Sequence, residues 1–204
     1  MAGEVLVFGG TFDPVHNGHI AIAEQALEQI AAGSVWFVPA RVPALREHPV
    51  ASVEDRVDML AAALQHQHGL VLRTDEVERA GASYTVDTMR ALHGAYPHTE
   101  FLVLIGADAA RTMPRWERAA ELLAGDDFLI VNRSGTPRLD EHEAAWLGFD
   151  TRGSRLITVD SPDISASEVR RRVAAGLPID GLVPEPVAAL IRDRGLYLAR
   201  AAGA

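Results

Sequence analysis

The stretch at residues 5–20 constrains the fold of this chain more than any other. It begins with the apolar run 5–8, continues with Gly9 and Gly10, and leads into apolar residues at helical spacing between Ile20 and Ile30. The pattern predicts a buried strand, a glycine turn and a helix that starts directly after the turn. The free amides and the positive dipole end of such a helix attract anions, and the glycines let a phosphate approach the main chain.

Two histidines, His16 and His19, lie three residues apart in the first turn of this helix. Side chains at this spacing share one face, so both imidazoles can face a phosphate; a surface pair is the alternative. The dinucleotide fingerprint GxGxxG and the P-loop pattern GxxxxGK(S/T) are both missing, which excludes a Rossmann dehydrogenase and a P-loop protein. A zinc site lacks a third ligand, because the chain has no HExxH motif and no cysteine.

Strand and helix patterns alternate along the rest of the chain, with no internal repeat and no Ser/Gly linker. The run 101–105 is the most apolar and is typical of a central strand that is buried on both faces of a parallel sheet. We therefore expect an α/β fold, an open parallel sheet of Rossmann-like topology with helices on both faces, in a single domain over residues 1–204. Residues 134–154 give no clear pattern. Further strands are predicted at 34–38, 70–73, 128–131 and 155–159.

Composition and charge exclude several classes of protein. The 204 residues carry a formal net charge of −9, which argues against a general nucleic-acid binder, since such a protein needs a basic face. The lack of cysteine excludes a disulfide framework and thiol catalysis. No basic segment precedes an apolar signal region, and no apolar run is long enough to cross a membrane. We expect a cytoplasmic protein that has neither a nucleic-acid partner nor a membrane association.

The run GGTFDPVHNGH at residues 9–19 resembles the signature of the HxGH nucleotidyltransferase superfamily, most closely that of bacterial nicotinate-nucleotide adenylyltransferases. The resemblance implies a Rossmann-like nucleotidyltransferase fold in which this stretch binds ATP. The residues that it assigns to ATP here are Gly9, Gly10, Thr11, Phe12, His16 and His19.

The stretch ISASEVR at residues 164–170 resembles the second signature of that family, ISSTxIR, with Ala166 in place of the second serine and Ser167 in place of threonine. Ser165 and Ser167 open a predicted helix with Arg170 one turn later, so hydroxyls, amides and a guanidinium converge on a phosphate. The alternative is a capped surface helix. This second phosphate motif belongs to a C-terminal helical part at about 161–200 of the single domain.

Two further motifs concern the nucleoside of ATP. Gly106 and Asp108 follow the strand 101–105 at its carboxyl end, the edge where ligands of open α/β sheets bind. The resemblance gives Asp108 the ribose hydroxyls, whereas a cap of the next helix is the alternative. Arg133 follows the strand 128–131 and is expected to lie against the adenine.

Three stretches resemble the pyridine-nucleotide site of the family. Thr85 lies in ASYTVDT, which matches PSYTxxT; capping explains a hydroxyl here, and the resemblance adds contact with the nicotinate carboxylate. Trp116, in PRW, is expected to stack on the pyridine ring, with core packing as the alternative. In the loop at 43–46, Leu45 and Arg46 replace the family's histidine and lysine. Arg46 could still neutralise a phosphate, although a solvated side chain is the alternative.

The resemblance implies adenylyl transfer from ATP to nicotinate mononucleotide, which gives nicotinate adenine dinucleotide and pyrophosphate in NAD biosynthesis. No catalytic serine, cysteine or carboxylate pair emerges, and none is needed if the acceptor's own phosphate is the nucleophile. His16, His19 and Arg170 are the expected catalytic residues, because they would hold the ATP phosphates. Mg²⁺ is expected to come with ATP, carried by phosphates and water, with no metal site on the protein.

Several alternatives stay open. The altered loop at 43–46 leaves nicotinamide mononucleotide as a rival acceptor. A phosphopantetheine adenylyltransferase shares the first motif but is generally shorter and lacks the ASYT and PRW features. A dinucleotide sensor without turnover is a third reading, motivated by Leu45 and Ala166. The sequence leaves the oligomeric state open, and a homo-oligomer is one of the alternatives.

Overall fold

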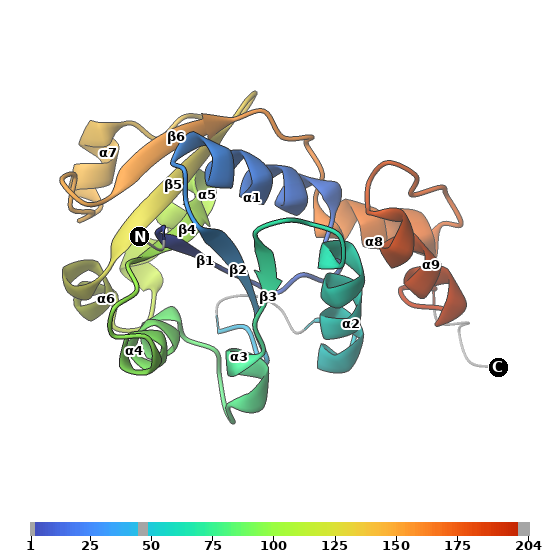
Figure 1. Cartoon of the computed structure of the whole chain (residues 1–204). Coiled ribbons are helices and arrows are strands. Elements are labelled where there is room, and N and C mark those ends of the chain that lie inside the picture. Colours follow the sequence, from blue (N-terminus) through green and yellow to red (C-terminus); the bar gives the residue numbers. More distant parts are fainter. Residues whose placement is uncertain (1–2, 45–48, 200–204) are drawn as a thin grey trace.

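The computed structural model describes residues 3–44 and 49–199, and Figure 1 shows their arrangement. All six strands of one sheet pair in parallel in the order β3-β2-β1-β4-β5-β6, which confirms the predicted open α/β sheet. The strands are β1 (Val5–Gly10), β2 (Ser34–Pro39), β3 (Leu70–Leu72), β4 (Phe101–Gly106), β5 (Asp127–Arg133) and β6 (Arg155–Val159). The helices are α1 (Asn17–Gln29), α2 (Val53–Leu64), α3 (Asp75–Glu78), α4 (Thr85–Ala95), α5 (Ala107–Ala110), α6 (Ala119–Gly125), α7 (Glu141–Trp146), α8 (Ala166–Ala174) and α9 (Glu185–Asp193), with a 3-10 turn, η1, at Met113–Arg115.

The order of the strands reverses between β1 and β4, and there the two strands separate. The β1–β4 pairing stops at Val7 opposite Val103, whereas β1 stays paired with β2 as far as Gly10, and β4 stays paired with β5 as far as Gly106. Such a switch point leaves a crevice outside the carboxyl ends of the strands, where ligands of this architecture bind. Gly10 is the last residue of β1 and Gly106 is the last residue of β4, so both glycine motifs end at this crevice.

Helices cover both faces of the sheet, as predicted, because neighbouring strand residues point in opposite directions. Leu6 and Phe8 of β1 pack in a core that includes side chains of α1, α2, α8 and α9. Val5 and Val7 pack on the other face, with side chains of α4, α5, α6 and α7. The helices themselves can be followed in Figure 1. The helix α8, which carries the second phosphate motif, therefore shares a core with α1, which follows the first motif. No helix of the described residues is long and apolar enough to cross a bilayer.

The predicted glycine turn is wrong in its position. Gly9 and Gly10 are the last residues of β1, and the chain turns at Phe12, which has a left-handed φ of 49°. A Cβ on Gly10 would lie 2.8 Å from Cζ of Phe12, so this glycine makes room for the ring. A Cβ on Gly9 would meet nothing within 4 Å. Gly9 is therefore open toward the crevice, in keeping with the expected approach of a ligand to its main chain.

The segment 134–154, which gave no clear pattern in the sequence, contains α7. Asp140 caps this helix, because its carboxylate accepts a hydrogen bond of 2.8 Å from the Glu143 amide. Arg111 holds the helix from the other side of the crevice rim, with its Nε 2.6 Å from Oε1 of Glu143. Trp146 at the end of α7 is exposed and takes no part in the core.

We expect Gly10→Ala to lower the free energy of unfolding by about 1–3 kcal/mol, the usual effect of overpacking. Phe12 cannot yield easily, because it is 2% exposed and its ring meets those of Phe8 and Phe37. Gly9→Ala is the matched control and should leave the urea midpoint unchanged. Equal midpoints for the two variants would contradict this account of the turn.

Candidate active site

The two histidines lie at the start of α1, beside the crevice. His16 is the N-cap residue of the helix and His19 belongs to its first turn. Their rings are stacked, with centroids 3.6 Å apart and an interplanar angle of 23°. The His16 amide donates a hydrogen bond of 3.2 Å to Nδ1 of His19, so the neutral His19 ring carries its proton on Nε2. The ring of Phe12 packs edge-on against His19 at 5.0 Å and fixes its orientation.

The His16 ring is neutral at ordinary pH. Burial lowers its pKa to about 4, and the nearby Arg133 cation acts in the same direction. Its Nδ1 is buried and finds no hydrogen-bond partner among the described residues, 3–44 and 49–199. The ring lies in a capping-box arrangement with the His19 amide, so this nitrogen is directed at the main chain of the helix start.

Gly18 and Asn17 hold the start of α1 against the C-terminal part of the chain. A Cβ on Gly18 would lie 3.1 Å from Nδ1 of His16 and 3.3 Å from the Pro162 carbonyl, so a larger residue would require these neighbours to shift. The Asn17 amide donates to the Leu182 carbonyl at 2.9 Å. The His19 backbone amide donates to the His16 carbonyl at 2.9 Å. The expectation of free amides at this helix end is therefore wrong for both Asn17 and His19.

Asp13 connects the first motif with three other segments. Its carboxylate is 5% exposed and accepts hydrogen bonds from the Val50 amide (2.8 Å), the Ala51 amide (3.1 Å) and the Tyr197 hydroxyl (2.8 Å). Burial and the Asp13 charge raise the pKa of Tyr197, so its hydroxyl keeps the donated proton. Asp13 and Tyr197 were not among the predicted site residues, because no local pattern relates two positions 184 residues apart.

Arg170 links the second phosphate motif to the first. Its Nη1 donates to the Asp13 carbonyl at 2.7 Å and lies 3.7 Å from the Asp13 carboxylate. Its Nη2 donates to Oγ of Ser167 at 3.2 Å. The side chain is 28% exposed, so the guanidinium is held in place and still reaches the crevice. The structure thus brings Arg170, Ser167 and the histidine segment together, as the paired motifs predict.

Ser165 is the N-cap residue of α8, and its Oγ accepts a hydrogen bond of 3.2 Å from the Glu168 amide. The capping alternative is therefore confirmed as a structural role. A hydroxyl that accepts one bond still has a proton to donate, so contact with a phosphate stays a prediction for this residue.

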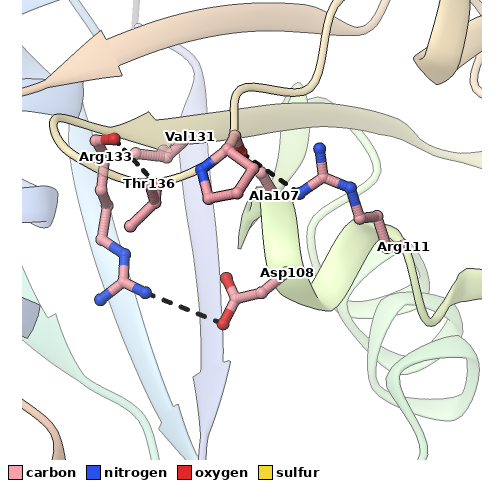
Figure 2. A pocket seen from close by; sticks show the side chains of 7 residues that line it. Ala107, Asp108, Arg111, Val131, Arg133 and Thr136 are labelled. Carbon is pink, nitrogen blue, oxygen red and sulfur yellow. Dashed lines mark hydrogen bonds and ion pairs between the residues drawn. The ribbon is translucent and has the colours of Figure 1, made fainter.

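A cavity of about 230 Å³ lies between the ends of β4 and β5, at the residues expected to bind the nucleoside (Figure 2). Asp108 and Arg133 face each other across it, with Nη2 of Arg133 3.9 Å from Oδ2 of Asp108. Asp108 belongs to the first turn of α5, and its side chain is 72% exposed and thus accessible to ribose hydroxyls. A Cβ on Gly106 would lie 2.7 Å from Oδ1 of Asp108, so glycine leaves room for the carboxylate.

The pyridine side is described in part. Arg46 and Leu45 lie outside the described residues. Thr85 is the first residue of α4, and the N-cap residue is Tyr84, without a side-chain hydrogen bond. The expected hydroxyl cap of this helix is therefore wrong: Oγ of Ser83 instead accepts from the Arg41 amide at 2.9 Å.

Trp116 follows η1, and its indole N–H donates to Oγ1 of Thr112 at 2.9 Å. Its ring is half-buried beside the core, so the packing alternative holds in part.

Arg56 was missed at the sequence level. It is 1% exposed in α2, and its Nη1 donates to the Thr11 carbonyl at 2.7 Å, which anchors the turn after β1. Burial lowers its pKa, while the Asp13 charge opposes that effect. The sequence does indicate that Arg56 is buried, because it lies three residues after Val53 and four before Leu60, on the apolar face of its helix.

Comparisons with known proteins agree with this geometry. The model of a cytidylyltransferase-like family matches residues 7–172. A protein of Exiguobacterium sibiricum named "Probable nicotinate-nucleotide adenylyltransferase" is 39% identical over 193 residues, which is 94% of this chain and 97% of the relative. A protein of Herpetosiphon aurantiacus with the same name is 37% identical over 199 residues, 95% of this chain and 98% of the relative.

Among solved structures, a Plasmodium falciparum nicotinic acid mononucleotide adenylyltransferase complexed with NaAD has a similar fold. Its TM-score is 0.81 at 18% sequence identity, with 96% of this chain and 97% of that chain covered. The same enzyme complexed with APC gives a TM-score of 0.79. At this identity the likeness concerns the fold alone.

The low pKa of His16 predicts how stability depends on pH. Between pH 6.5 and about 4 the unfolded chain binds a proton at His16 that the folded protein does not bind. The free energy of unfolding should therefore fall as the pH is lowered through this window, by about 3 kcal/mol from this residue. Urea unfolding of His16→Gln should show a correspondingly weaker pH dependence, whereas His68→Gln, in an exposed turn, should keep that of the original protein. Identical pH profiles for His16→Gln and the original protein would show that His16 is not held neutral.

Proposed function

The chain belongs to the cytidylyltransferase-like family, with nicotinate-nucleotide adenylyltransferases as its relatives, and on this premise we propose that it transfers the adenylyl group of ATP to nicotinate mononucleotide. The products are nicotinate adenine dinucleotide and pyrophosphate, in NAD biosynthesis. The observation that carries the proposal is the hydrogen bond of 2.7 Å from Arg170 to the Asp13 carbonyl. It joins the two phosphate motifs at one crevice, where neither could hold a triphosphate alone.

The reaction needs no nucleophile from the protein. A phosphate oxygen of nicotinate mononucleotide attacks the α-phosphorus of ATP, and the bond from that phosphorus to the β-phosphate oxygen breaks. Orientation of the two substrates can supply about 7–11 kcal/mol of the barrier reduction, whereas each hydrogen bond to a charged group supplies about 1.5–3 kcal/mol. Positioning therefore dominates, which fits a site whose residues are fixed by hydrogen bonds to the main chain.

His16, His19 and Arg170 are the proposed catalytic residues. The Nε2–H of His19 and the Arg170 guanidinium would donate to phosphate oxygens and stabilise the charge that develops on pyrophosphate. The neutral state of His16 follows from its lowered pKa and lets it lie near Arg133 without repulsion between cations. Asp108 and Arg133 would hold the ribose and the adenine, Thr85 the nicotinate carboxylate, and Trp116 the pyridine ring.

We propose that Mg²⁺ accompanies ATP, bound by phosphate oxygens and water. The donor set of the described residues fits this arrangement, since they contain no group of three or more His, Asp or Glu side chains that could hold a metal ion. Asp13, the carboxylate nearest to the histidines in sequence, already accepts three hydrogen bonds. The ion would supply charge neutralisation for the leaving pyrophosphate. We expect the reaction in the cytoplasm.

Pyrophosphate release from ATP and Mg²⁺ tests the proposal, with nicotinate mononucleotide and nicotinamide mononucleotide compared in parallel. We expect a large preference for the acid and loss of the activity in His19→Ala. Equal rates or a preference for the amide would replace the acceptor in the proposal. No release with either, together with tight binding of the dinucleotide, would refute the enzyme and leave a sensor.

Arg170→Lys should lower kcat/KM for ATP by about tenfold to a hundredfold, because an ammonium cannot keep the contacts with Asp13 and Ser167 and still reach a phosphate. Arg171→Lys is the matched control. That neighbour is 64% exposed and pairs with Glu168, so its activity should stay within about twofold of the original. Equal effects of the two substitutions would remove Arg170 from the site.

A further inference from the structure

A buried carboxylate lies outside the proposed mechanism, beneath the start of α4. Glu76 of α3 is 6% exposed, and its Oε1 accepts a hydrogen bond of 2.6 Å from the Thr88 hydroxyl. The Ser83 hydroxyl also donates to this carboxyl. Burial raises the pKa of Glu76, whereas the two hydroxyls and the Arg79 cation favour its charged form. A buried carboxylate with such partners requires a reason beyond stability, because apolar residues of similar volume usually stabilise a core as well.

The two hydroxyls around Glu76 each accept a hydrogen bond from elsewhere. Nη2 of Arg79 donates to Oγ1 of Thr88 at 3.0 Å, and the Arg41 amide donates to Oγ of Ser83 at 2.9 Å. The one proton of the Thr88 hydroxyl goes to Glu76 at 2.6 Å, with the Tyr84 carbonyl at 3.3 Å as the more distant acceptor, and the proton of the Ser83 hydroxyl remains for Glu76. Chains of this kind polarise one another and are rigid when every member is satisfied.

The two hydroxyls belong to segments that border the proposed acceptor site. Thr88 lies in the first turn of α4, three residues after Thr85. Ser83 forms a parallel bridge with Pro43, and its amide donates to the Val42 carbonyl at 2.9 Å. Glu76 therefore lies between Thr88 at the start of α4 and Ser83, the residue that holds the segment 41–43, which leads into the loop at 43–46.

We propose that Glu76 is a positioning residue for the pyridine mononucleotide, which it never touches, because it fixes the α4 N-terminus and the segment 41–43 relative to each other. The inference rests on the proposed function, in which these two segments receive the acceptor. The ATP phosphates lie at α1 and α8, and none of the hydrogen bonds around Glu76 reaches those helices. The residue should thus act on one substrate only.

Steady-state kinetics of Glu76→Gln tests this inference. The substitution replaces one of the two acceptor oxygens by an NH2 group, which cannot accept from a hydroxyl, so we expect KM for nicotinate mononucleotide to rise by about tenfold or more, the effect of a small misplacement of a binding group. KM for ATP should stay within about twofold. Glu78→Gln is the matched control, since it makes the same change two residues later at an exposed position of α3, and both KM values should be unchanged.

A second pair of variants separates positioning from general stability. Thr88→Val removes the hydroxyl at constant shape and should reproduce the rise in acceptor KM, while Thr88→Ser keeps the hydroxyl and should restore it. A purely structural role would lower the active fraction, and thus kcat, with both KM values preserved. Unchanged acceptor KM in Glu76→Gln and Thr88→Val, or equal rises for both substrates, would overturn the inference.

The two proposals can fail separately. Activity of the original protein together with an unaffected Glu76→Gln removes only the role of Glu76. If the original protein releases no pyrophosphate, the proposed function fails, and calorimetric titration with nicotinate mononucleotide then decides about Glu76: weaker binding by Glu76→Gln supports it. Equal binding by the variant, or no binding by the original protein, overturns it.

Discussion

The Asp13 carboxylate is the interaction on which the site depends. A buried charge is stable only when hydrogen bonds replace the water it has lost, and here the donors come from distant parts of the chain: two amides at 50 and 51 and the Tyr197 hydroxyl. The Asp13 carbonyl meanwhile accepts from Arg170. One residue of the first motif thereby sets the distance between the two phosphate motifs. Removal of any partner would leave a buried charge short of a donor, so the arrangement holds as a unit.

Local electrostatics in the site run against the balance of the whole chain. The net charge is −9, yet the groups that face the crevice beside the histidines include the cations Arg133 and Arg170. Burial and the nearby Arg133 cation lower the pKa of His16 and keep its ring neutral, so the positive charge beside the histidines comes from guanidinium groups. Positive charge is thus gathered at one place on a chain that is negative as a whole.

The fold and half of the site could be predicted from the sequence, because their signals are local. Apolar runs gave the strands, and the histidine spacing placed both rings at one helix end. Signals failed where a distant partner decides the local structure. Ser83 carries a hydroxyl next to a helix start, but this hydroxyl bonds to the Arg41 amide and to Glu76 and therefore does not cap the helix. The turn lies at Phe12 because its ring packs in the core, and the position of the glycines in the sequence does not reveal that packing. Arg46 lies outside the described residues, so the choice of acceptor stays a prediction.

The contact between Asp13 and Tyr197 also sets an order in time. A chain leaves the ribosome from its N-terminus, so the GGTFDP segment is made early and waits for a donor that is 184 residues further along. Until that residue has emerged, the Asp13 carboxylate lacks one of its three donors. The first motif therefore reaches its final hydrogen bonding only after residue 197 has left the ribosome, even though Arg170 can meet the Asp13 carbonyl earlier.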